Sequence, residues 1–100
     1  MKNKYLYKKL KYELALSYMY NRSKRYCTWR QISWKLCECF NVEFTNQRYS
    51  VIHNFSYALN REIRMDIPYL CYTDKMFIDY ANTHNLKLYD IKECKFVNSV

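Results

Sequence analysis

The sequence predicts a mainly α fold (α+β), in which a compact bundle of three to four helices is followed by a small C-terminal β element. Two patterns support this prediction. Apolar residues recur at spacings of three and four along 5–20, 29–40 and 46–64, as they do on one face of a helix. Segment 86–91 instead alternates apolar and polar residues, which is typical of a strand. Because no repeat or linker divides the sequence, we expect a single domain over 1–100.

Threonines mark the starts of the later helices. Thr28 stands three residues before Gln31, which is the spacing of a capping box, in which each side chain satisfies a backbone N–H of the other residue. Thr45 and Thr73 are the next candidate N-caps. Thr73 would begin a fourth helix over 74–82. These caps define the helix starts more sharply than periodicity alone does.

The helix ends and the strands are predicted from local signals. Pro68 ends the third helix, because residues that precede proline avoid the α region. Asn85 is expected to end the fourth helix in the left-handed conformation. Segments 86–91 and 94–97 are the candidate strands, with 69–72 as a further partner.

Composition argues against several classes of enzyme. Phosphate-cradling loops and dinucleotide-binding fingerprints require glycine, and the sequence contains none. His53 and His84 have no acidic or cysteine neighbour that would suggest a catalytic pair, and the acids are scattered. The five cysteines lack Cys-x-x-Cys spacing. We therefore expect no enzymatic activity, no catalytic residue, no cofactor and no metal.

Compartment and origin also follow from composition. No apolar run is long enough for a membrane span or a secretory signal, so we expect a cytoplasmic protein with reduced thiols and no membrane partner. Lys, Asn, Tyr and Ile are abundant, and their codons are rich in A and T. Short accessory genes of phages and mobile elements have this bias, so we expect an origin of that kind, with the protein acting in the host cytoplasm.

Positive charge is concentrated in the first half of the chain. Residues 1–50 hold 11 Lys and Arg against three acids, whereas residues 51–100 hold six of each sign. The net charge of +8 therefore belongs to one half. Such asymmetry predicts a surface for an anionic partner, and nucleic acid is the leading candidate.

Region 28–64 resembles a helix-turn-helix, with two capped helices joined by a turn at 41–44. The resemblance implies that the second helix would enter the major groove with its N-terminal residues. The turn departs from the motif because it has no glycine or other small residue. An ordinary helical hairpin without groove contacts is the alternative.

The candidate binding residues follow from charge, residue type and position. Basic residues would contact phosphates, and polar residues at the start of the third helix would contact bases or phosphates. The candidate nucleic-acid-binding residues are Lys4, Lys8, Lys11, Arg22, Lys24, Arg25, Arg30, Asn46, Gln47, Arg48 and Ser50. Exposed aromatic residues are common anchors at protein interfaces. The candidate partner-binding residues are Tyr20, Tyr26 and Trp34.

Three functions fit these observations. The first is a non-enzymatic, nucleic-acid-binding regulator of phage or mobile-element type. The second is a phage-type inhibitor that binds and blocks a host protein or nucleoprotein, for example one in defence, transcription or replication. The third is a packaging protein that coats nucleic acid without sequence preference. The concentration of positive charge favours the first, and the inhibitor is the alternative.

Overall fold

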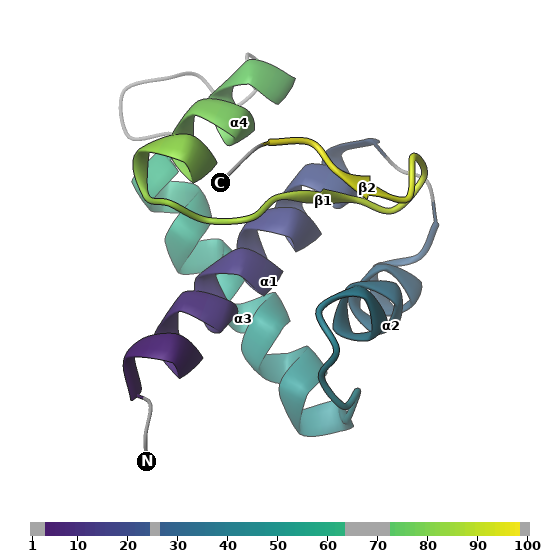
Figure 1. Cartoon of the computed structure of the whole chain (residues 1–100). Coiled ribbons are helices and arrows are strands. Elements are labelled where there is room, and N and C mark those ends of the chain that lie inside the picture. Colours follow the sequence, from purple (N-terminus) through teal and green to yellow (C-terminus); the bar gives the residue numbers. More distant parts are fainter. Residues whose placement is uncertain (1–3, 25–26, 64–72, 99–100) are drawn as a thin grey trace.

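Four helices and a short β-hairpin make up the described part of the chain, which covers residues 4–24, 27–63 and 73–98 of the computed structural model. In chain order the elements are α1 (Lys4–Lys24), α2 (Trp29–Cys39), α3 (Asn46–Ile63), α4 (Asp74–Thr83), β1 (Tyr89–Asp90) and β2 (Lys95–Phe96) (Figure 1). This confirms the mainly α fold with a small C-terminal β element. Several predictions lie outside the described residues: the helix stop at Pro68, the strand at 69–72, and the side chains of Lys4, Arg25 and Tyr26.

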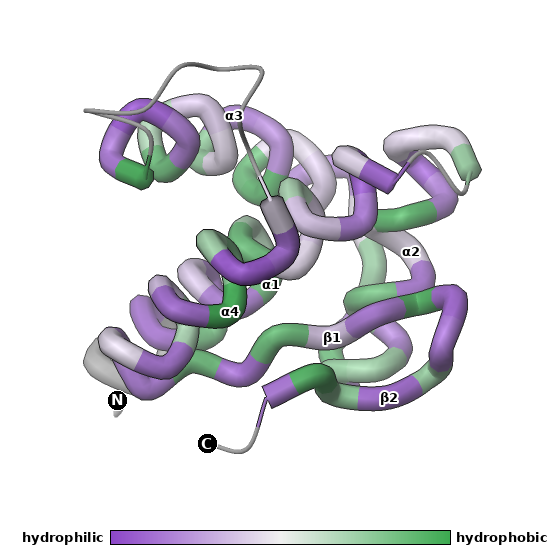
Figure 2. The backbone as a smooth tube through the Cα atoms, turned by 90° about the horizontal axis from the view of Figure 1, so that it is seen from above, coloured by the Kyte–Doolittle hydropathy of each residue, from purple (hydrophilic) through white to green (hydrophobic). Residues whose placement is uncertain are grey.

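Helix α1 is the central element of the fold. It lies between α3 on one side and the C-terminal strands on the other (Figures 1 and 2). All nine residues from Glu13 to Asn21 are buried, although the sequence pattern predicted a single apolar face. Leu14 and Tyr18 contribute to one apolar cluster, whereas Leu16 contributes to a second cluster on the opposite side of the helix. Helix α1 therefore contributes to both clusters of the core, and burial of each large apolar side chain stabilises the fold by about 2 kcal/mol.

The capping predictions hold at the starts of α2 and α3. The Gln31 backbone N–H donates to Thr28 Oγ1 at 3.2 Å, and the Thr28 N–H donates to Gln31 Oε1 at 3.0 Å. At α3, the Arg48 N–H donates to Thr45 Oγ1 at 3.0 Å. These bonds satisfy donors that the first turn of a helix leaves without partners inside the helix.

Asparagine adopts the left-handed conformation, which usually favours glycine, after two of the helices. Asn85 follows α4 with φ of 57°, as expected, and Asn41 follows α2 with φ of 60°. Asparagine tolerates this region better than most residues because its side chain bonds locally. Helices α2 and α3 therefore follow one another across a tight turn without a glycine.

The two strands pair with one another. Tyr89 is opposite Phe96 and Asp90 is opposite Lys95 in an antiparallel register. Each strand has two residues, which is shorter than the segments 86–91 and 94–97 that the alternation predicted. The residues before β1 run alongside α1 and bond to its side chains instead.

A ladder of side chains on α1 satisfies the backbone of this C-terminal segment. The donors are the N–H groups of Lys87, Tyr89 and Ile91; their acceptors are Glu13 Oε2 at 2.8 Å, Ser17 Oγ at 3.1 Å and Asn21 Oδ1 at 2.9 Å. Four residues of helix span about 6 Å and two residues of strand about 6.6 Å, so every fourth side chain meets every second N–H. The polar residues of α1 are therefore buried because the strand segment supplies their partners.

Within the residues that the structure describes, no helix combines the length and the apolar character needed to cross a bilayer.

Candidate nucleic-acid interface

An aromatic cluster forms around His53, where the end of α1, the start of α2 and the first half of α3 meet. The hydroxyl of Tyr18 lies 2.7 Å from His53 Nδ1, and the hydroxyl of Tyr57 lies 3.3 Å from Nε2. The rings of Trp29 and Tyr49 lie 5.4 and 5.8 Å from the imidazole, with interplanar angles of 31° and 30°. Both ring nitrogens of His53 therefore have partners, and aromatic rings surround it.

Two arginines lie on the rings of this cluster. The Arg22 guanidinium lies 4.0 Å from the centre of the Trp29 ring, and the Arg30 guanidinium lies 5.5 Å from that of Tyr49. Arg30 also donates to Asn46 Oδ1 at 2.5 Å, which joins the starts of α2 and α3. Cations at these distances are attracted by the negative faces of the rings. We refer to this surface as the arginine–aromatic face, made of Arg22, Trp29, Arg30, Tyr49, His53 and Tyr57.

Neither arginine of this face forms an ion pair with a carboxylate among the described residues. The helix dipoles act on the two arginines in opposite ways. Arg22 lies in the last turn of α1, where the helix dipole attracts cations. Arg30 lies in the first turn of α2, where the dipole disfavours a cation, so the rings and Asn46 hold it there. The positive charge of this face is therefore available to an anion from outside.

The electrostatics of the cluster keep its histidine neutral. Burial, and then the nearby Arg22 guanidinium, lower the pKa of His53 below its ordinary value near 6.5. Burial raises the pKa of the Tyr18 hydroxyl, so this group stays protonated. The charge of the face at neutral pH is therefore that of its arginines.

Two rings of the face are open to solvent. Trp29 is 43 % exposed and Tyr57 is 46 % exposed. Large aromatic side chains usually bury more of their surface, and here two exposed ones share a face with two arginines that pair with no described carboxylate.

The structure brings together three of the predicted nucleic-acid-binding residues: Arg22, Arg30 and Asn46. Lys11, Gln47 and Arg48 line a separate hollow of about 230 Å³ between α1 and α3. There the Lys11 ammonium lies 4.4 Å from the ring of Phe55, and Arg48 Nη1 donates to the Glu43 carbonyl at 2.9 Å. Lys8 and Ser50 are exposed and belong to neither group.

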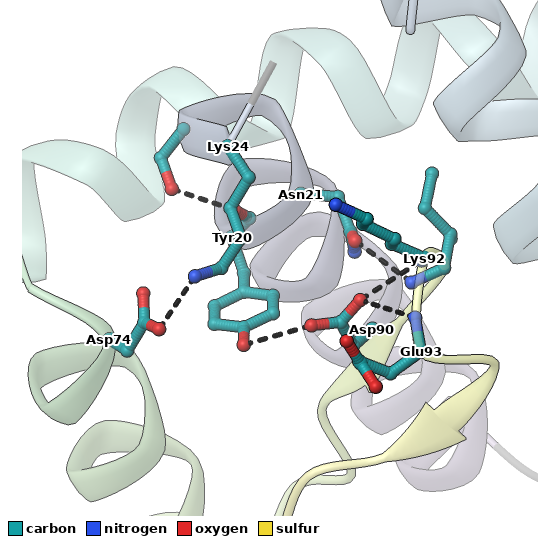
Figure 3. Close-up of polar contacts among 9 residues, drawn as sticks. Tyr20, Asn21, Lys24, Asp74, Asp90, Lys92 and Glu93 are labelled. Atoms are coloured by element: carbon teal, nitrogen blue, oxygen red, sulfur yellow. Dashed lines mark hydrogen bonds and ion pairs between the residues drawn. The ribbon is translucent and has the colours of Figure 1, made fainter. Parts of the chain in front are cut away.

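Two of the predicted residues have partners within the fold. Lys24 pairs with Asp74 of α4 at 2.6 Å and lies 4.9 Å from the centre of the Tyr20 ring (Figure 3). Tyr20 was expected to contact a partner, but it is only 3 % exposed and donates to Asp90 Oδ2 at 3.2 Å. Their structural partners are acids in the second half of the chain.

Trp34 does lie on the surface, as a partner-binding residue must. It is 48 % exposed on the outer side of α2, and the Lys35 ammonium lies 5.5 Å from its ring.

The sequence analysis considered His53 only as a possible catalytic residue and did not predict it as the centre of a cluster. One signal was present: Tyr49, His53 and Tyr57 recur every four residues and therefore share one stripe of α3. The contribution of Trp29 was also not predicted, because its spacing with Ile32 and Leu36 is typical of one buried helix face.

In the described part of the chain, no group of three or more His, Cys, Asp or Glu residues could hold a metal ion. Cys27, Cys37, Cys39 and Cys94 are free thiols, and only Cys37 is buried.

Comparison with protein-family models, with curated proteins and with solved structures gave no match. The function must therefore be inferred from the residues of this chain.

Proposed function

We propose that this protein binds nucleic acid, without catalysis, through the arginine–aromatic face. The observation that supports the proposal most is that Arg22 and Arg30 are positioned on rings at one surface and pair with no carboxylate of the described residues. A phosphate backbone supplies the missing negative charge, and its counterions are released on binding.

The contrast with Lys24 strengthens this proposal. Lys24 is only two residues from Arg22 in α1, yet it forms an ion pair with Asp74 at 2.6 Å. The same helix end therefore carries one cation with a structural role and one that pairs with no acid in the described ranges. A regulator of phage or mobile-element type is the form of nucleic-acid-binding protein that composition favours. Gln47 and Ser50, exposed at the start of α3, would be its base-contacting residues if the helix pair reads a groove.

The test is fluorescence anisotropy with labelled duplex and single-stranded oligonucleotides between 50 and 300 mM salt, roughly the range over which phosphate contacts change affinity most. The double variant Arg22→Ala/Arg30→Ala should bind at least about tenfold more weakly than the parent protein. The slope of log affinity against log salt should fall by about 1.4 to 1.8, because two phosphate contacts are lost.

A matched control removes the same charge from another surface. Lys75 and Lys95 are exposed on α4 and β2. The variant Lys75→Ala/Lys95→Ala should keep most of the affinity, since these lysines lie outside the face. Equal losses in the two double variants would show that only total charge matters and would contradict the proposed site.

A second candidate, the inhibitor of a host protein, is favoured by Trp34 alone. A tryptophan that is 48 % exposed on a helix surface is a typical interface anchor. This function predicts capture of a host protein that survives nuclease treatment and is lost in Trp34→Ala. Capture that nuclease abolishes would instead support the nucleic-acid-binding function.

A further inference from the structure

We propose that the nucleic acid bound by this face is single-stranded, with unpaired bases stacking on Tyr57 and Trp29 while Arg22 and Arg30 contact the phosphates. This inference rests on the proposed function and narrows it to one class of ligand.

The setting of Tyr57 supports a stacking role. Its ring lies 5.2 Å from that of His53 at 83°, and its hydroxyl lies 3.3 Å from Nε2. The two rings are nearly perpendicular, so the imidazole is not stacked on the Tyr57 ring. Because 46 % of the residue is exposed, a planar ligand has access to this side chain.

Trp29 combines a ring with a charge. The Arg22 guanidinium lies 4.0 Å from the ring centre, and 43 % of Trp29 is exposed. Each nucleotide of a flexible strand also joins a flat base to a charged phosphate. The face offers a ring for the base and a guanidinium for the phosphate, and it does so again where Arg30 contacts Tyr49.

Charge alone would not select between a duplex and a single strand, but the open rings do. In a duplex the base faces are stacked on one another and only groove edges and phosphates are exposed. Unpaired bases offer their faces to aromatic side chains, which is how many single-strand-binding surfaces work. Phosphate contacts to a duplex would require cations but no exposed tyrosine or tryptophan.

The experiment compares three probes of equal phosphate number. These are a single-stranded pyrimidine oligonucleotide, a strand of the same length with abasic sites throughout, and a blunt-ended duplex. We expect the single strand to bind at least about tenfold more tightly than the abasic strand, because each stacked base contributes substantially. Parallel measurements with DNA and RNA strands identify the sugar preference of the same chemistry.

Two variants at Tyr57 separate the ring from the hydroxyl. Tyr57→Ala should lose about tenfold in affinity for the single strand and leave binding of the abasic strand unchanged. Tyr57→Phe keeps the ring and should bind like the parent protein. Because Tyr57 is half exposed, both variants should fold, which circular dichroism checks.

Trp29 reports stacking directly. The variant Trp34→Phe leaves Trp29 as the only tryptophan of the chain. Its fluorescence should be quenched by the single strand and not by the abasic strand.

The failures of the two proposals are distinguishable. Equal affinity for all three probes, with no effect of Tyr57→Ala, would overturn the single-strand inference and leave nucleic-acid binding intact. Absence of binding to every probe at low salt would overturn the proposed function itself.

Discussion

The two sides of α1 use their polar residues in opposite ways. On the strand side, Glu13, Ser17 and Asn21 are buried and bond to the C-terminal segment. On the other side, at the end of α1, Arg22 reaches toward α2 and contacts a ring instead of an acid. Adjacent residues of one helix, Asn21 and Arg22, thus belong to different surfaces.

The two sides of α1 therefore distinguish polar groups that stabilise the fold from polar groups that are available to a ligand. Asp90 is typical of the strand side: it is 3 % exposed and accepts from the Tyr20 hydroxyl and from the N–H groups of Lys92 and Glu93 (Figure 3). Every one of these donors and acceptors is used within the chain, so the network fixes the fold. Polar groups that the fold does not use, such as the Arg22 charge, are those available to a ligand.

The largest expected effect comes from breaking the strand side at Asn21. Asn21→Leu removes the acceptor for the Ile91 N–H and the donor to the Tyr89 carbonyl, bonds of 2.9 and 2.7 Å. Two buried backbone groups would lose their partners, so the free energy of unfolding should fall by about 3 kcal/mol. Urea denaturation followed by circular dichroism measures the change.

The matched control makes the same substitution at an exposed position of α3. Asn54→Leu should change the unfolding free energy by no more than about 0.5 kcal/mol. Below its melting temperature, Asn21→Leu should retain the nucleic-acid affinity of the parent protein. A stability equal to that of the Asn54 control would show that the hairpin does not depend on this bond pair.

A smaller effect is expected on the ligand side, at the cap of α2. Thr28→Ala removes the acceptor of the Gln31 N–H and should lower the unfolding free energy by about 1 kcal/mol. Because Trp29 and Arg30 occupy the first turn that this cap holds, affinity for the single strand should fall as well. Thr83→Ala, at an exposed position at the end of α4, is the control in both assays. If Thr28→Ala lost stability but kept its affinity, the first turn of α2 would not be part of the binding surface.

The helices could be predicted because their signals are local. Thr28 with Gln31, and Thr45 with Arg48, act within three residues, so the sequence alone places the starts of α2 and α3. The complete burial of α1 could not be predicted in this way. Glu13 bonds to the N–H of Lys87, 74 residues later, and amphipathic periodicity contains no information about so distant a partner.

The same limit applies to the candidate site residues. Arg22 and Arg30 were predicted from charge, and no described acid pairs with them. The sequence did not reveal the internal partners of Lys24 and Tyr20, because Asp74 and Asp90 lie 50 and 70 residues away. Residue type alone does not distinguish these cases, because pairing is decided by tertiary contacts.

The smallest expected effect is a pH dependence centred on His53. Its pKa is lowered in the folded state, mainly by burial and then by Arg22, so the folded protein prefers the neutral imidazole. The unfolded chain takes up a proton at higher pH than the folded chain. Stability is therefore fully present above the unfolded pKa near 6.5 and is lost as the pH falls below it toward the folded pKa. The titratable side chains that contact the imidazole are Tyr18, Tyr49 and Tyr57.

Urea denaturation at pH 7.5, 6.5 and 5.5, a range that brackets the ordinary histidine pKa, tests this linkage. The variant His53→Gln should be less stable than the parent protein at the highest pH, because hydrogen bonds to Tyr18 and Tyr57 are weakened, but its stability should fall less on acidification. Arg22→Met, which removes the charge and keeps an apolar chain near Trp29, should also reduce the loss, because one of the two causes of the shift is gone. His84 is retained in all three proteins and cancels in the comparison. If the unfolding free energies of the three proteins fell equally with pH, the Arg22 charge would not affect the pKa of His53. The cluster around His53 would then stabilise the fold by packing alone.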